Sequence, residues 1–113
     1  MIPTSTRVFL YTVPQDMRRG FDLLVQVVLK EMGGDPRSGD VFVFTSRGSD
    51  RVKLLWWERN GYAVLYKRLH GATTRPPKAP DPSMRALELD GKGLAALMRG
   101  VDRPPRGARR NRS

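Results

Sequence analysis

The apolar positions in the first third of the chain change from a strand pattern to a helix pattern. Bulky and β-branched residues at positions 7–13 predict a short β-strand. A helix is predicted to follow, with Asp16 as its N-cap and the Gly33-Gly34 pair at its end. Gly20 lies inside this helix, where it either permits close packing or marks an irregular first turn. The apolar face of the helix recurs at three- and four-residue steps and comprises Met17, Phe21, Leu24, Val25, Val28 and Met32.

The middle of the chain carries three segments with strand character. Residues 41–44 form an uninterrupted apolar run, which is typical of a central strand. Residues 52–57 and 62–69 are predicted to form two further strands. The Asn60-Gly61 dipeptide between them is a strong signal for a β-hairpin. We therefore predict an antiparallel meander in this region.

The last third of the chain combines a proline-rich segment with a short predicted helix. Residues 71–83 contain four prolines and are predicted to form an extended loop. A short strand is predicted at 85–89, and Asp90 is the predicted N-cap of a final helix. Residues 103–113 are rich in Pro, Gly and Arg and are predicted to be disordered. The apolar side of the final helix comprises Leu94, Leu97, Met98 and Val101.

Together these elements predict an α+β fold in a single domain over residues 1–102, followed by a disordered Arg-rich tail. An antiparallel sheet of about four strands is expected, with one long amphipathic helix packed on it and a short C-terminal helix. A chain of 113 residues suits one compact domain of this kind.

The predicted hairpin divides its side chains between the two faces of the sheet. If Asn60-Gly61 is the two-residue loop, Arg59 lies opposite Tyr62, and successive residues alternate between the faces. One face is expected to pack against the first helix. Its members are Val52, Leu54, Trp56, Ala63, Leu65 and Leu69, with Glu58 and Lys67 as polar exceptions. The other face comprises Arg51, Lys53, Leu55, Trp57, Arg59, Tyr62, Val64, Tyr66 and Arg68.

The interleaved aromatic and basic residues of this second face predict a nucleic-acid-binding surface. Aromatic rings stack on bases, and cations neutralise phosphates. Two competing interpretations are that the tryptophan belongs to the core and that the basic residues form an ordinary solvated face. A shift in register by one residue would exchange the two faces. The predicted nucleic-acid-binding residues are Arg18, Arg19, Arg51, Lys53, Trp57, Arg59, Tyr66 and Arg68.

The chain is strongly basic, with 21 Lys and Arg residues against 11 Asp and Glu residues and a formal net charge of +10. Five of the arginines lie in residues 101–113, so the body of the protein is basic even without its tail. This charge favours nucleic acid as a partner, although charge also serves solubility alone. The Arg18-Arg19 pair near the start of the first helix either holds a phosphate or forms a solvated turn. The tail is expected to add salt-sensitive affinity without sequence specificity.

The sequence lacks the residue combinations of common catalytic and metal sites. It contains no cysteine and a single histidine, His70, for which no acid–base partner is evident. Its Asp residues fall mainly at predicted caps and turns, where backbone interactions explain them. We therefore predict no enzymatic activity, no cofactor, no bound metal and no small-molecule substrate. No segment is apolar enough to span a membrane and the N-terminus lacks a secretory pattern, so we expect a cytoplasmic protein.

Several of these segments also occur, in the same order and spacing, in one known family. They are residues 16–21 (DMRRGF), 35–39 (DPRSG), 41–44 (VFVF) and 50–57 (DRVKLLWW), supported by 1–3 (MIP) and 67–69 (KRL). Over most of residues 1–70 the chain resembles the TnpB-type (Orf2-like) accessory proteins of insertion sequence family 66. It departs from them after Leu69, where family members carry an aromatic-rich stretch ending in Trp-Pro and this chain has Thr73-Thr74-Arg75-Pro76-Pro77.

The resemblance implies a transposon-encoded protein that assists transposition, while strand cleavage and joining belong to a separate transposase of the same element. It supplies no catalytic residues to carry over. DNA binding and contact with the transposase are the suspected roles, so the alternative is a protein–protein adaptor with only nonspecific DNA contact. A third hypothesis, a small RNA-binding or ribonuclease-like protein, is disfavoured by the lack of a general acid–base pair.

Overall fold

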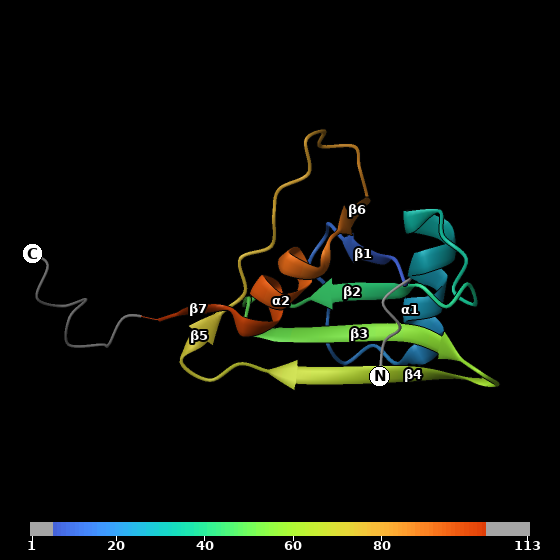
Figure 1. The fold of residues 1–113 in the computed structure, drawn as a ribbon, viewed down its shortest axis with the longest axis horizontal. Helices are drawn as coiled ribbons and strands as arrows, with labels where there is room; N and C mark the ends of the chain where they lie inside the picture. The colour runs from blue at the N-terminus through green and yellow to red at the C-terminus, as the bar shows by residue number, and fades with distance from the viewer. Residues whose placement is uncertain (1–5, 104–113) are drawn as a thin grey trace, which may run out of the picture.

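The computed structural model describes residues 6–103, so residues 104–113 of the predicted disordered tail lie outside the described part. The fold is α+β, with a five-stranded sheet, a small two-stranded sheet and two helices (Figure 1). The elements are β1 (Val8–Tyr11), α1 (Phe21–Val27) with its π-helical continuation η1 (Val28–Met32), β2 (Val41–Thr45), β3 (Arg51–Glu58), β4 (Gly61–Arg68), β5 (Ala72–Thr73), β6 (Ala86–Leu89), α2 (Gly91–Arg99) and β7 (Val101–Asp102).

The main sheet is mixed, which corrects the expectation of an antiparallel sheet of about four strands. Its strand order is β4-β3-β2-β1-β6. The strands β1 and β2 are parallel, whereas the other neighbours are antiparallel. The helix between β1 and β2 carries the chain back across the sheet, so that both strands run in the same direction. The strands β5 and β7, which were not predicted, pair within a separate two-stranded sheet.

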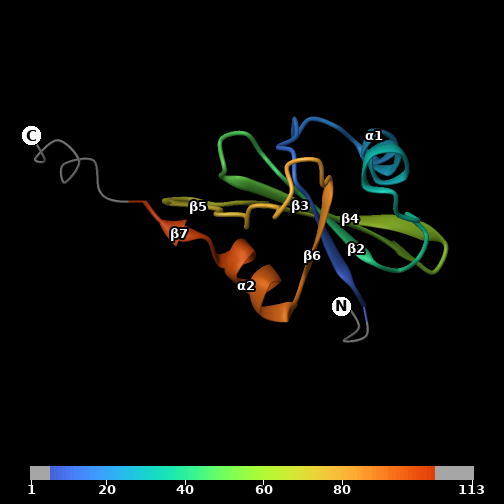
Figure 2. The ribbon, with the colours of Figure 1, turned by 90° about the horizontal axis from the view of Figure 1, so that it is seen from above.

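Two helices cover opposite faces of the main sheet, so the molecule has three layers (Figure 2). The α1 face has a core that includes the aromatic residues Phe42 and Phe44. The core of the α2 face is aliphatic and includes Val43 and Leu97. Every residue of β2 is buried, which explains the continuous apolar run in its sequence and confirms its central position.

The first helix begins at Phe21, not near Asp16 as predicted. The Asp16 carboxylate accepts hydrogen bonds from the backbone N–H of Arg18 at 2.9 Å and from its guanidinium at 2.7 Å. These bonds stabilise a turn over residues 16–19 and compete with helical backbone there. Gly20 is extended (φ −90°, ψ −169°) and forms the N-cap, so it precedes the helix.

The predicted cap of α2 and the predicted hairpin are both confirmed. The Asp90 side chain accepts a hydrogen bond from the N–H of Gly93 at 2.7 Å. In the hairpin, Glu58 pairs with Gly61, so the loop residues are Arg59 and Asn60 instead of Asn60-Gly61. The observed register differs from the predicted one by two residues, so each side chain has a different cross-strand partner. Because the side-chain period is two, the same side chains still share a face.

The two faces of the hairpin meet different helices from those expected. Val52 and Leu54 pack against α2, whereas the first helix covers the opposite face around Leu55 and Val64. This correction has a packing reason, because Leu55 lies beside Phe42 of β2 and extends an apolar centre across the predicted outer face. The charged residues of that face are confined to its ends.

Candidate nucleic-acid interface

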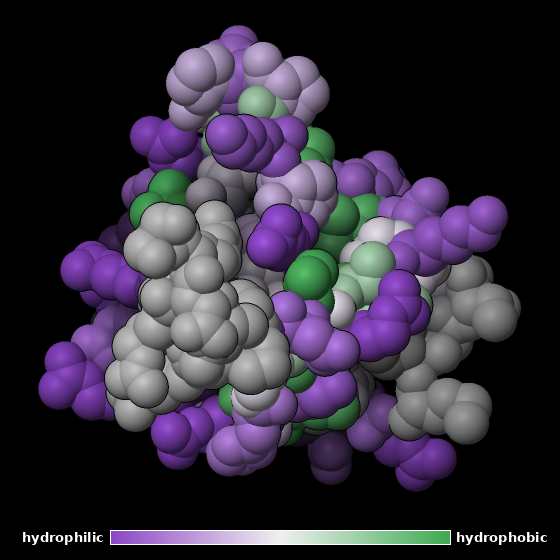
Figure 3. Space-filling view, turned by 90° about the vertical axis from the view of Figure 1, so that its left-hand side faces the viewer, coloured by the Kyte–Doolittle hydropathy of each residue, from purple (hydrophilic) through white to green (hydrophobic). Residues whose placement is uncertain are grey.

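Cationic residues gather at the end of the α1 face where β3 begins and β4 ends. In the strand register, Arg51 lies opposite Arg68 and Lys53 lies opposite Tyr66. Figure 3 shows this end of the molecule, and hydrophilic residues cover most of its coloured surface. Two arginines in direct cross-strand opposition repel each other, so this pairing is not explained by sheet stability.

Lys53 connects the turn over residues 16–19 to the sheet. Its ammonium donates hydrogen bonds to the carbonyl oxygens of Met17 and, at 2.9 Å, Arg19. It also lies 5.3 Å from the centre of the Tyr66 ring. The side chain of Lys53 is therefore a positioning element, and it brings the Arg18-Arg19 pair beside the basic end of the hairpin.

A groove of about 460 Å³ lies between this turn and the β2–β3 connection. It is lined by three arginines and two carboxylates, with neutral residues between them: Gln15, Asp16, Met17 and Arg19 on one wall, and Ser46, Arg47, Gly48, Asp50 and Arg51 on the other. We call it the arginine groove. Its two walls are joined by a hydrogen bond of 2.8 Å from the N–H of Gln15 to the carbonyl of Thr45.

The second wall of the arginine groove is held by Ser46. Its Oγ accepts the N–H groups of Asp50 at 3.3 Å and Arg51 at 3.0 Å, and donates to the Asp50 carboxylate at 3.2 Å. These bonds fix the turn that carries Arg47. The groove is thus formed by two turns whose backbones are fixed by their own hydrogen bonds, and its cations project from that frame.

The cations around the arginine groove differ in how far acids neutralise them. Arg18 is paired with Asp16, and this contact holds the pKa of the Asp16 carboxyl well below its usual range and raises the pKa of Arg18. The Nε of Arg51 is 4.0 Å from Asp50, is shielded from solvent and has no acceptor in the structure. Within residues 6–103, neither Arg47 nor Arg68 forms an ion pair.

The eight predicted residues fall into two separate groups. Six lie together at the basic end: Arg18, Arg19, Arg51, Lys53, Tyr66 and Arg68. Trp57 and Arg59 lie near the hairpin loop, about 13 Å and about 20 Å along the chain from Lys53. The Trp57 ring packs edge-on against Tyr62 with 5.0 Å between centroids, and it is therefore part of a local aromatic contact.

Two cations of this surface were missed from the sequence. Arg47 joins the arginine groove because residues 15 and 46 form a bridge that extends the parallel pairing of β1 and β2. The guanidinium of Arg37 lies 4.5 Å from the centre of the Trp57 ring and covers part of that ring. The position of Arg47 in a turn close in sequence to Arg51 was a weak indication that it belongs to this surface. The contact between Arg37 and Trp57 is long-range, and no sequence pattern indicates it.

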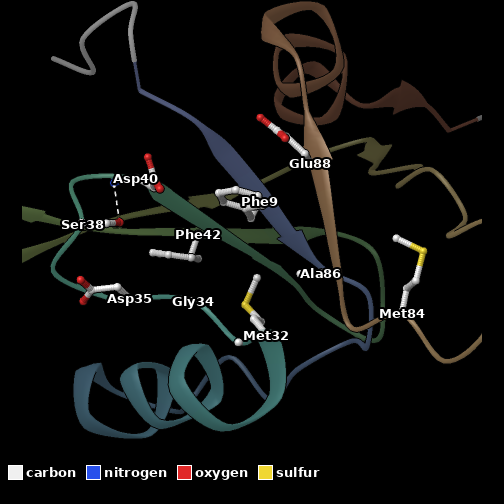
Figure 4. Close-up of a pocket in the computed structure, with 11 residues that line it drawn as sticks. Phe9, Met32, Gly34, Asp35, Ser38, Asp40, Phe42, Met84, Ala86 and Glu88 are labelled. Atoms are coloured by element: carbon white, nitrogen blue, oxygen red, sulfur yellow. Dashed lines mark hydrogen bonds between the residues drawn. The ribbon is translucent and has the colours of Figure 1, made fainter.

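A second groove, of about 420 Å³, opens on the same sheet face beyond the other end of the helix (Figure 4). We call it the apolar groove. The rings of Phe9 and Phe42 stack within it at 6.0 Å, and Met32 reaches toward them from the end of η1. Met84 and Ala86 line the opposite side, next to the edge strand β6.

The rim of the apolar groove carries the carboxylates of Asp35, Asp40 and Glu88. Glu88 is paired with Arg7 at 2.8 Å, and this contact lowers the pKa of the Glu88 carboxyl. The apolar groove therefore differs in character from the arginine groove, although both flank the same helix.

The described part of the chain contains neither a cluster of metal ligands nor a membrane-spanning helix. Across residues 6–103, no three His, Asp or Glu side chains converge as a metal site would require. None of the helices there is long and apolar enough to cross a lipid bilayer. His70, the single histidine, is exposed at the end of β4.

Comparison with known proteins places the chain among relatives over most of its length. Residues 6–107 match the model of the family described as IS66 Orf2-like protein. Two proteins of Sinorhizobium fredii (strain NBRC 101917 / NGR234), both described as uncharacterized, are similar to it. Protein y4jC is 31% identical over 96 residues, covering 85% of this chain and 80% of the relative. Protein y4hO is 30% identical over 104 residues, covering 90% and 88%. No solved structure matches the chain.

Proposed function

Since this chain belongs to the IS66 Orf2-like protein family, we propose that it is a non-catalytic accessory protein of a bacterial insertion sequence that assists a separate transposase by binding DNA. Membership of this family implies an accessory role in an insertion sequence. The proposal goes beyond this role in assigning DNA binding to the chain itself. We place the contact at the basic end of the α1 face.

The proposal rests on the cations around the arginine groove that form no ion pair within the described residues. Arg47 and Arg68 are exposed and form no ion pair within the described residues. Arg19 donates its hydrogen bond at 3.2 Å to the neutral Gln15 side chain and keeps its charge available. Phosphate groups release condensed counterions when such cations bind them, which supplies affinity that falls steeply with salt.

Fluorescence anisotropy with labelled duplexes tests this proposal directly. The full-length protein is titrated with a terminal inverted repeat of its element and with a scrambled duplex, at several salt concentrations. Tighter binding of the repeat supports a sequence-specific accessory factor, whereas equal binding reduces the role to nonspecific contact. A protein that binds neither duplex at low salt contradicts the DNA-binding proposal.

Matched charge variants locate the contact. Replacing Arg19, Arg47 and Arg68 together with Gln removes three phosphate contacts, so the slope of log affinity against log salt should decrease by about 2.7. The control variant removes the same amount of charge from exposed helical positions by replacing Lys30, Lys92 and Arg99 with Gln. An equal loss of DNA affinity in the two variants would show that net charge alone is responsible.

The apolar groove supports the alternative, a protein–protein adaptor for the transposase. Its acidic rim favours a segment of the transposase that carries apolar side chains between basic residues. We expect a Met84→Glu variant to lose co-purification with the transposase after nuclease treatment, since the new carboxylate enters the apolar wall. Unchanged co-purification would remove this groove from the adaptor hypothesis.

A further inference from the structure

We infer that the basic end of the α1 face holds an unpaired DNA strand, with a backbone phosphate in the arginine groove and a neighbouring base on the ring of Tyr66. This inference rests on the proposed DNA-binding function and names the form of DNA that the site fits. It depends on two independent features: a guanidinium that lacks acceptors and an exposed aromatic ring on the edge strand.

The phosphate position follows from the state of Arg51. Its guanidinium makes no hydrogen bond to any described residue: the Asp50 carboxylate lies 4.0 Å from its Nε, beyond hydrogen-bond distance, and this Nε is shielded from solvent. A buried donor without a partner is costly, and native structures rarely retain one without a function. Arg68 stands directly across the strand pair and adds like-charge repulsion. The Arg51 side chain is 37% exposed, so a phosphate in the groove would meet its outer N–H groups, and the added negative charge would offset that repulsion.

The arginine groove suits an oxyanion that belongs to a polymer. It is open to solvent along one side and is framed by backbone that is already hydrogen-bonded. Arg19 and Arg47 enter it from opposite walls. Arginine binds phosphate through planar, paired N–H groups, and here these groups come from separate turns that can grip one backbone position.

The base position follows from Tyr66. Its side chain is 52% exposed although it is large and partly apolar. It lies on β4, the outermost strand of the sheet, two residues from Arg68 on the same face and therefore about 7 Å away. The ammonium of Lys53 lies near the ring at 5.3 Å and holds the neighbouring turn in place. A ring beside a phosphate-binding cation is the arrangement that single-strand-binding surfaces use.

The exposed ring discriminates between paired and unpaired DNA. In a duplex, the faces of the bases are stacked on one another, so a surface tyrosine gains nothing from them. An unpaired base can leave its neighbours and lie on the ring. Phe21 is also 46% exposed, but its ring lies 6.5 Å from that of Tyr62 near the hairpin loop, so Tyr66 is the ring assigned to the base.

The test compares three ligands of equal length by fluorescence anisotropy: a labelled oligothymidylate, an abasic strand and a duplex. The variants are Tyr66→Ser and Tyr66→Phe, with folding checked by circular dichroism. Loss of one stacked base should weaken oligothymidylate binding of Tyr66→Ser by about five- to 150-fold. The abasic strand and the duplex should bind this variant as they bind the natural protein, and Tyr66→Phe should retain oligothymidylate binding.

The outcomes separate this inference from the proposed function. Duplex binding that depends on the arginine groove, combined with no effect of Tyr66→Ser on oligothymidylate, overturns the single-strand inference and leaves the DNA-binding proposal standing. Failure to bind any of the three ligands contradicts both. Preference for oligouridylate RNA over oligothymidylate, lost in Tyr66→Ser, would also overturn it by assigning the site to RNA.

Discussion

The two faces of the sheet differ in how completely a helix covers them. On the α2 face, Leu97 lies in a continuous aliphatic core, and Lys67 extends from β4 to donate a hydrogen bond to the carbonyl of Met98 at 2.8 Å. On the α1 face, the helix covers an aromatic centre around Phe42 and Phe44 and leaves a groove at each end. The α2 face therefore serves to bury a core and so close the fold. The α1 face combines this closure with two grooves that are open to solvent.

A small basic domain can therefore keep a closed core and still form binding sites at the ends of its strands. The apolar side chains of the α1 face lie in the middle of the strands, and the charged side chains lie where the strands end. Strand ends are joined by turns, and turns can bring distant cations together without interrupting the core. The arginine groove is formed in this way by the turns that contain Asp16 and Arg47.

The largest expected effect concerns the aromatic centre of the α1 face. Phe44 is fully buried, so Phe44→Ala should lower the free energy of unfolding by about 3–5 kcal/mol, measured by urea denaturation. Leu97→Ala, on the α2 face, removes a smaller side chain and should cost less than Phe44→Ala, within a range of about 2–5 kcal/mol. A larger loss in Leu97→Ala would show that the aromatic centre contributes less to closing the fold than the aliphatic core, which contradicts the description of the α1 face as combining closure with open sites.

A second test probes how tightly the apolar groove is packed at its inner end. A Cβ atom added at Gly34 would lie 2.9 Å from Cε1 of Phe42 and 3.3 Å from Cγ1 of Val28. Both side chains are buried, so Gly34→Ala should lower the free energy of unfolding by about 1–3 kcal/mol. Gly91→Ala is the control, because Gly91 is the first residue of α2 and a Cβ there meets nothing within 4 Å. Similar losses in both variants would show that steric contact is not the cause.

Much of the fold was predictable because its signals are local. The central strand at 41–44, the existence of the hairpin and the Asp90 cap each depend on neighbouring residues, and each is confirmed, although the hairpin loop is Arg59-Asn60. The parallel pairing of β1 with β2 was missed because it depends on the route of the chain over the sheet. The late start of α1 was missed because Asp16 binds Arg18 locally instead of capping the helix.

The candidate site was predictable only in part, for a similar reason. Alternation along the hairpin correctly placed Arg51, Lys53, Tyr66 and Arg68 on one face. The alternation did not show that α1 would cover the middle of that face. Such an inference requires knowing which of the two helices packs against which face of the sheet. The contribution of Arg47 depends on a bridge between residues 15 and 46, which no local pattern encodes.

A third prediction concerns the smaller helix. The Asp90 carboxylate satisfies the backbone N–H of Gly93 at the start of α2, so Asp90→Ala should cost about 1 kcal/mol of unfolding free energy. Asp90→Ser retains an acceptor and should recover most of this loss. DNA binding at the α1 face should be unchanged in both, as the two faces are separate. Weaker DNA binding in Asp90→Ala would show that the faces are coupled and would undermine the distinction between them.

The smallest expected effect is an increase in affinity at the basic end. Asp16→Asn keeps the side-chain oxygen that accepts the N–H of Arg18 but removes the charge that neutralises its guanidinium. With Arg18 released, DNA should bind about two- to threefold more tightly at low salt, because an exposed ion pair is worth little and a freed cation gains a phosphate.

The pKa of Asp16 sets the pH range of this last comparison. Its hydrogen bonds to Arg18 lower the folded-state pKa below the unfolded value of about 3.9. The stabilisation by this pair is therefore present above that value and is lost as the pH falls through the lower folded pKa. Asp16 stays ionised from pH 5 to 8, so the ratio of variant to natural affinity should be constant across that range. A ratio of one throughout would show that Arg18 does not contact DNA and would confine the site to the arginine groove and Tyr66.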